Sequence, residues 1–95
     1  MATLYKHDGT VLTVEPKDKR GFRLPELYRL LECNMIQVIY PPNEETIMVI
    51  DEEGKLKDDF DARYNEKATG IMGDRLFPGD FVTGNALVCT NDELQ

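Results

Sequence analysis

Five carboxylates lie close together in the second half of the chain: Asp51, Glu52, Glu53, Asp58 and Asp59. Paired carboxylates can act as general acid and general base, and their oxygen atoms can bind a divalent cation. An EF-hand calcium loop has oxygen ligands before its central glycine, but aligning Gly54 with that glycine places the apolar Val49 at the first ligand position. We therefore expect neither a metal site nor a catalytic pair. The simpler interpretation of these acids is a solvated turn, and as site residues they are candidates for binding a protein partner.

The other residues with catalytic potential do not form a recognisable constellation. His7 is the chain's one histidine, and no serine or cysteine motif accompanies it, so nucleophilic catalysis is disfavoured. Cys33 and Cys89 belong to no Cys-x-x-Cys pair, which argues against zinc and favours two buried, reduced thiols. The sequence also has no glycine-rich phosphate loop. We expect a protein that is not an enzyme and has no metal or cofactor.

Negative charge is concentrated in one half of the chain. Residues 1–43 carry five acidic and six basic side chains, residues 44–95 carry thirteen acidic and five basic ones, and the net charge is -7. Such a surface repels phosphate backbones, so we expect no direct binding of nucleic acid. The exception is a basic loop that, with the Gly84-Asn85 bend, forms a candidate site for a phosphate or other small ligand: Lys17, Lys19, Arg20 and Arg23. The simpler interpretation of this loop is a solvated segment.

The first half of the chain predicts a hairpin, a helix and a second hairpin. Residues 3–6 and 11–15 have strand character and are joined through Asp8-Gly9, a pair that favours tight hairpin turns. Residues 35–40 and 46–50 predict the second hairpin, on either side of two prolines. Between the hairpins, apolar residues recur at helical spacing and a proline suits the first helical turn: Leu24, Pro25, Leu27, Tyr28 and Leu31.

After the acidic turn the pattern is weaker. Residues 55–57 predict a short strand extension, and one of the aspartates at 58, 59 and 61 is expected to cap a helix that begins near Ala62. Apolar spacing continues that helix to Met72, although Thr69 and Gly70 weaken it. The last strand is expected over residues 80–90, with a bend or bulge at the Gly84-Asn85 pair.

These elements together predict an α+β fold, in which an antiparallel sheet of four to five strands, built from hairpins, packs two helices on one face. The 95 residues have room for one small domain, spanning residues 1–95. The sequence contains no apolar stretch of membrane-spanning or signal-peptide character, so we expect a cytoplasmic protein. The expected core is Leu4, Val11, Leu27, Leu31, Ile36, Val38, Ile47, Val49, Ala68, Ile71, Leu87 and Cys89.

Four short segments carry a resemblance to a known family. Residues 4–10, 47–56, 65–69 and 84–89 read LYKHDGT, IMVIDEEGKL, NEKAT and GNALVC. Together they resemble a small domain-of-unknown-function family, number 3846, whose members are typically encoded by bacteriophages and conjugative elements of bacteria. The resemblance implies a genomic context and no activity. Members usually have Gly-Asp where this chain has Gly84-Asn85, so any catalytic or metal role of that aspartate would be in doubt here.

We therefore favour a small non-enzymatic binding or regulatory module, encoded by a phage or mobile genetic element, that presents its acidic half to a protein partner. A first alternative is a counter-defence protein that sequesters a small molecule or nucleotide at the basic loop and the Gly84 bend. A second alternative is an acidic antirestriction-type DNA mimic, although eleven interspersed basic residues make this chain a poor mimic. The sequence leaves the partner and the oligomeric state open.

Overall fold

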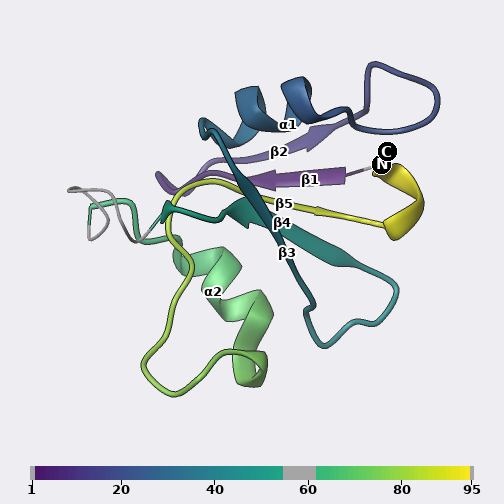
Figure 1. Cartoon of the computed structure of the whole chain (residues 1–95). Helices are drawn as coiled ribbons and strands as arrows, with labels where there is room; N and C mark the ends of the chain where they lie inside the picture. The colour runs from purple at the N-terminus through teal and green to yellow at the C-terminus, as the bar shows by residue number, and fades with distance from the viewer. Residues whose placement is uncertain (1, 55–61, 95) are drawn as a thin grey trace.

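A computed structural model describes residues 2–54 and 62–94 as a five-stranded antiparallel sheet with two α-helices (Figure 1). The sheet has the order β2-β1-β5-β4-β3, so the last strand lies between the two predicted hairpins. The α+β class and the antiparallel sheet expected from the sequence are confirmed. The strands are β1 (Ala2–Tyr5), β2 (Val11–Val14), β3 (Ile36–Ile39), β4 (Ile47–Asp51) and β5 (Ala86–Cys89). The helices are α1 (Leu24–Leu31) and α2 (Glu66–Met72), with the 3₁₀ turns η2 (Gly73–Arg75) and η3 (Asn91–Glu93).

Both hairpins form where the sequence predicts them. In the β1–β2 turn, Gly9 has a φ of 97°, and the Asp8 carboxylate accepts the Thr10 N–H at 2.8 Å. In the β3–β4 loop, the Asn43 side chain accepts the Glu45 N–H at 3.1 Å. These local hydrogen bonds fix the turns and leave β2 and β3 as the two edges of the sheet.

The second helix begins later than predicted. It starts at Glu66, and its N-cap is Asn65, whose side-chain oxygen accepts the Ala68 N–H at 3.0 Å. A helix cannot begin near Ala62 because Tyr64 is extended and forms an antiparallel bridge with Thr83. The expected caps at positions 58, 59 and 61, and the expected strand extension at 55–57, lie outside the described residues.

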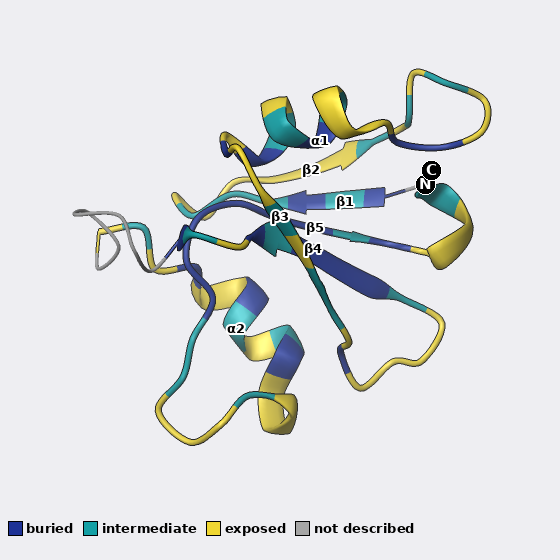
Figure 2. Cartoon of the chain, viewed as in Figure 1, coloured by how far each residue is buried: buried dark blue, intermediate teal, exposed yellow. Residues whose placement is uncertain are grey.

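The two helices pack on opposite faces of the sheet, so the prediction that they share one face is wrong. On the α1 face, Leu27 and Leu31 pack with Val49 and Leu87, among other buried side chains. On the α2 face, the buried cluster is Met48, Ala68, Met72, Val82 and Ala86. The reason lies in β4, where successive side chains point to opposite faces and both faces are buried (Figure 2).

Most of the expected core is buried, with two kinds of exception. Val11 is 45% exposed because β2 is an edge strand, while three apolar side chains at the margins are only half-buried: Ile36, Val38 and Ile71. The last strand is also shorter than predicted, because Gly84 has a φ of 77° and turns the chain just before Ala86. Its other end stops at Cys89, where Thr90 and Glu93 form a capping box for η3.

Both cysteines are buried and unbridged, as the sequence predicts. Neither helix in the described part of the chain has the length or apolar content that a membrane span requires.

Candidate functional site

The acidic turn after β4 combines one buried carboxylate with two more accessible ones. Asp51 is only 4% exposed, and its Oδ1 atom accepts the Glu53 N–H at 2.9 Å, so this residue shapes the turn. Glu52 is exposed and Glu53 is half-buried. The turn ends at Gly54, whose backbone packs so closely against Thr83 that a Cβ atom there would overlap the threonine hydroxyl. Asp58 and Asp59, the other acids assigned to partner binding, lie outside the described residues.

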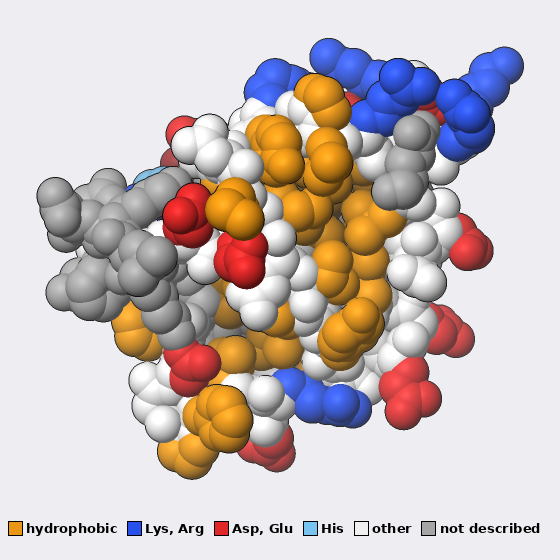
Figure 3. Space-filling model, in the orientation of Figure 1, with side chains coloured by type: hydrophobic (Ala, Val, Ile, Leu, Met, Phe, Trp, Pro, Cys, Tyr) orange, Lys and Arg blue, Asp and Glu red, His pale blue; other side chains and the backbone are white. Residues whose placement is uncertain are grey.

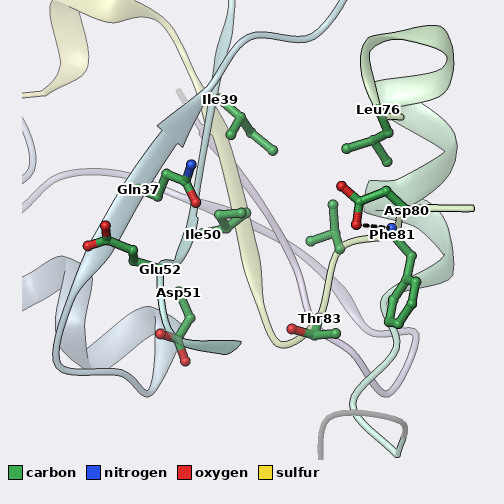
Figure 4. A pocket seen from close by; sticks show the side chains of 10 residues that line it. Gln37, Ile39, Ile50, Asp51, Glu52, Leu76, Asp80, Phe81 and Thr83 are labelled. Atoms are coloured by element: carbon green, nitrogen blue, oxygen red, sulfur yellow. Dashed lines mark hydrogen bonds between the residues drawn. The ribbon is translucent and has the colours of Figure 1, made fainter. Parts of the chain in front are cut away.

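A cavity of about 180 Å³ opens beside this turn, between the sheet and the segment that follows η2 (Figure 4). We call it the acidic cavity. Glu52 and Gln37 lie on its sheet side, Asp80 lies on the opposite wall, and Asp51 and Thr83 lie toward the same end. The complete lining is Gln37, Ile39, Ile50, Asp51, Glu52, Leu76, Asp80, Phe81, Val82 and Thr83.

The wall that carries Asp80 is held in place by hydrogen bonds to α2. The Val82 N–H donates to the Thr69 hydroxyl at 2.9 Å, and the Val82 carbonyl accepts the Asn65 N–H at 2.8 Å. Asp80 itself accepts the Phe81 N–H at 2.8 Å, and the Phe81 ring meets Tyr64 edge to face with centroids 5.3 Å apart. The Asp80 carboxylate is therefore presented from a fixed loop.

This arrangement suits a basic side chain better than a bare metal ion. Ile39, Ile50 and Leu76 provide apolar surface for an aliphatic stem, while Glu52 and Asp80 can accept hydrogen bonds from an ammonium or guanidinium group. Among the described residues, no three histidine, cysteine, aspartate or glutamate side chains are grouped as metal ligands would be.

A second cavity, of about 350 Å³, continues along β3 and shares Ile39, Leu76 and Asp80 with the first. We call it the aromatic cavity, because two strongly exposed aromatic side chains stand beside it: Tyr40 is 65% exposed and Phe77 is 83% exposed. Its other lining residues are Val38, Met72 and Arg75. The two cavities together form a trough along β3 on the α2 side of the sheet, and its acidic end also reaches Ile50 and Asp51 of β4.

The predicted phosphate contacts are divided between opposite ends of the sheet. The basic loop lies beside the segment that follows β5, because the Phe22 N–H donates to the Glu93 carbonyl at 2.6 Å. Gly84 and Asn85 lie immediately before β5, at its other end (Figure 1). The structure therefore does not bring the basic loop and the glycine bend into one ligand site.

Two members of the basic loop, Lys17 and Arg23, do line a surface cavity of about 380 Å³. Carboxylates offset this positive charge: Arg23 and Arg20 lie 2.9 Å and 3.6 Å from Asp18 oxygens, and Glu26 also lines the cavity. Lys19 is exposed and is not part of the lining. This mixed charge makes the cavity a weaker candidate for phosphate than the sequence indicated.

The bend before β5 has a packing role. Gly84 adopts a left-handed conformation, and its N–H donates to the Arg63 carbonyl at 2.7 Å. Asn85 is fully buried: its Nδ2 atom donates to the Leu30 carbonyl and to Glu32, both at 3.0 Å, and its Oδ1 atom accepts the His7 N–H. An ionised aspartate at this position could donate to neither the Leu30 carbonyl nor Glu32, because a carboxylate only accepts hydrogen bonds. The amide of Asn85 therefore suits this chain.

The sequence predicted Asp51 and Glu52 as site residues on the sheet side of the acidic cavity, but not Gln37 on that side or the opposite wall. Gln37, Asp80, Phe81 and Thr83 were not proposed as site residues, because they are brought together by tertiary packing. One signal was present in the sequence: Pro78-Gly79 precedes Asp80, and such a pair predicts a turn that projects a polar residue.

Comparison with known proteins identifies a family and no activity. A family model described as Domain of unknown function (DUF3846) matches residues 4–94. No curated protein and no solved structure matches the chain. The family resemblance seen in the four sequence segments is therefore confirmed over nearly the whole chain, and the geometry of the site has to carry any functional conclusion.

Proposed function

We propose that this chain, which belongs to the domain-of-unknown-function family DUF3846, is a non-enzymatic module that binds a basic segment of a protein partner in its acidic cavity. One observation carries the proposal: Glu52 and Asp80, on separate parts of the chain, line a common cavity whose lining also includes apolar residues such as Ile50 and Leu76. A lysine or arginine side chain would satisfy both parts of that lining, because it combines an aliphatic stem with a charged head.

The overall charge supports a basic protein partner over a nucleic acid. The chain carries a net charge of -7, which attracts basic surfaces and speeds their association. As part of the same proposal, the module is encoded by a phage or mobile genetic element and acts in the cytoplasm. The two buried thiols are in keeping with a reducing compartment.

A random twelve-residue peptide display library, selected against the purified protein, tests this function. We expect the selected peptides to be enriched in lysine and arginine and to bind less tightly as salt is raised. The double variant Glu52→Gln, Asp80→Asn should bind them about tenfold more weakly, because each change removes a carboxylate charge while keeping side-chain size. The side-chain carbonyl that Asp80→Asn introduces can still accept the Phe81 N–H, so the loop should be retained.

Asp92→Asn provides the matched control. This aspartate lies in η3, is exposed, and is not part of the acidic cavity, so the change alters net charge without altering the site. It should leave the affinity of the selected peptides nearly unchanged. Selection of peptides without basic residues, or equal weakening by the control and the double variant, would overturn the proposed function.

A further inference from the structure

Among the strands of the described residues, β3 forms one edge of the sheet. This edge lies along the same trough, and its geometry indicates how a partner would be held. We propose that the partner segment binds as an added antiparallel or parallel strand on β3, with basic side chains facing the acidic cavity and apolar side chains facing the other side of the sheet. This inference rests on the proposed function, since it specifies the conformation and side-chain pattern of the basic segment. Three features carry it: the free edge, the position of the trough and the charge around it.

The first feature is a set of backbone groups that point away from the sheet. The Glu52 N–H donates to the Met35 carbonyl at 3.0 Å, in register with the β3–β4 pairs Ile36↔Asp51 and Gln37↔Ile50. In an antiparallel pair, hydrogen-bonded and non-hydrogen-bonded residue pairs alternate. Gln37 and Ile39 therefore bond to β4, whereas the N–H and C=O groups of Ile36 and Val38 face outward, where a further strand would bond to them.

The second feature is that the trough lies at the strand edge itself. Val38 belongs to the α1 face and Ile39 to the α2 face, yet both line the aromatic cavity. A cavity lined by consecutive residues of an edge strand lies beside the backbone of that strand. The trough is therefore positioned for a segment that runs alongside β3 and bonds to its backbone.

The third feature is the chemistry on either side of this edge. On the α2 side, the segment would meet Gln37, Glu52 and Asp80, which favour basic side chains. On the α1 side, it would meet the half-buried Ile36 and Val38. Figure 3, which looks onto β3, shows hydrophobic side chains running in a band down this face, with acidic side chains next to them. Because neighbouring side chains of a strand point to opposite faces, the matching segment alternates basic with apolar residues.

A second copy of the chain fits this edge less well than a basic segment. Residues 35–40 contain no basic side chain, so β3 pairing with another β3 would bring no positive charge to the acidic cavity. Each copy would also bring a net charge of -7 to the interface. Charge complementarity therefore selects a different chain as the occupant.

The test uses a ten-residue acetylated peptide that alternates lysine with valine or phenylalanine, and a scrambled peptide of the same composition without alternation. We expect the alternating peptide to bind about tenfold more tightly than the scrambled one. Amide hydrogen exchange followed by NMR should slow at Ile36 and Val38, whose N–H groups face outward, and stay nearly constant at Gln37 and Ile39, which already bond to β4.

Two N-methylated versions of the alternating peptide provide controls that leave the protein unchanged. In one version, the peptide N–H groups that face β3 are methylated, and the protection of the Ile36 and Val38 amides from exchange should be lost. In the other version, the N–H groups that point away from β3 are methylated, and this protection should remain. A different result would overturn strand addition but leave the proposed function standing. In that result, the alternating and scrambled peptides both bind in a way that depends on Glu52 and Asp80, and the amides of Ile36 and Val38 stay unprotected. No binding by any basic peptide would overturn both. Protection of the same amides without peptide, accompanied by dimerisation, would show that a second copy occupies the edge and would overturn the assigned partner.

Discussion

The two faces of the sheet are held together by different kinds of interaction. Among the described residues, the α1 face has a buried cluster of ten apolar residues that includes Leu31 and Phe22. In the same part of the chain, the α2 face has five buried apolar residues, and side chains such as Asn65 and Thr69 anchor its loops by hydrogen bonds to the backbone. The acidic cavity opens on the second face. Anchoring by a few directional bonds fixes a loop without filling the space beneath it, and that space can then receive a ligand.

Removal of the Asn65 side chain should have the largest effect on the α2 face. Its Nδ2 atom donates to the carbonyls of Tyr5 and Gly84, both at 2.8 Å, and its Oδ1 atom accepts the Ala68 N–H. Asn65→Ala would leave these buried groups without their partner, so we expect the free energy of unfolding to fall by about 4 kcal/mol. Urea denaturation followed by circular dichroism measures this change.

Two further variants sharpen the same comparison. Asn65→Asp keeps the acceptor for the Ala68 N–H but loses both donors when ionised. This variant should therefore be less stable at pH 7 than at pH 4, where protonation restores one donor.

On the α1 face, Leu31→Ala should lower the free energy of unfolding by about 3 kcal/mol, because it leaves a cavity in the core. A loss below about 1 kcal/mol for Asn65→Ala would mean that the α2 face is held by apolar packing after all.

The sequence predicted the locally determined parts of this fold. The Asp8-Gly9 turn and the apolar spacing of α1 are encoded within short segments, and both form as expected. The placement of the helices was predictable in principle from the continuous apolar run Ile47–Ile50, because a strand buried on both faces has no alternation. Such a strand needs cover on both sides, which places the second helix opposite the first.

The candidate site was only partly predictable, for a similar reason. Glu52 follows a strongly apolar strand, so its exposure in a turn can be read from local pattern. Asp80 reaches the same cavity only because Val82 and Asn65, which are distant in sequence, pair through their backbones. The basic loop and Gly84 were expected together, but nothing in sequence distance indicates that β5 separates them.

A smaller loss of stability is expected when the contact between the acidic turn and Thr83 is disturbed. A methyl group at Gly54 would overlap the Thr83 hydroxyl, so Gly54→Ala should destabilise the protein by about 1 to 3 kcal/mol. Gly70→Ala is the matched control, because Gly70 lies within α2 with open space around it and alanine favours a helix. The control should stabilise the protein by about 0.5 to 1 kcal/mol.

Thermal unfolding of the two glycine variants measures the direction in which each change shifts the melting temperature. Opposite shifts of the melting temperature are expected, downward for Gly54→Ala and upward for Gly70→Ala. If Gly54→Ala were neutral, the acidic turn would be free to move away from Thr83, and the cavity could not be regarded as a fixed binding site.

The smallest expected effect is a loss of stability at alkaline pH, which comes from the Cys89 thiol buried on the α1 face. Burial, and next the nearby Glu93 carboxylate, raise the pKa of the Cys89 thiol to about 11 from an ordinary value of 9.0. Between those two values the unfolded chain has lost the thiol proton and the folded chain keeps it, so the folded state binds more protons. Stability must then fall as pH rises from 9 to 11, by about 1 kcal/mol at pH 10.

Comparison with Cys89→Ala isolates this contribution from other groups that titrate at alkaline pH. Alanine has no proton to lose, so its unfolding free energy should decline less steeply than that of the parent protein over this range. Urea denaturation at pH 8, 9.5 and 10.5 provides the two slopes. Parallel slopes would mean that the thiol can ionise in the folded state at little cost, and hence that water reaches the α1 face beside β5. A steeper slope for the parent would place Cys89 in a dry interior, in contrast to the open cavity on the other side of the sheet.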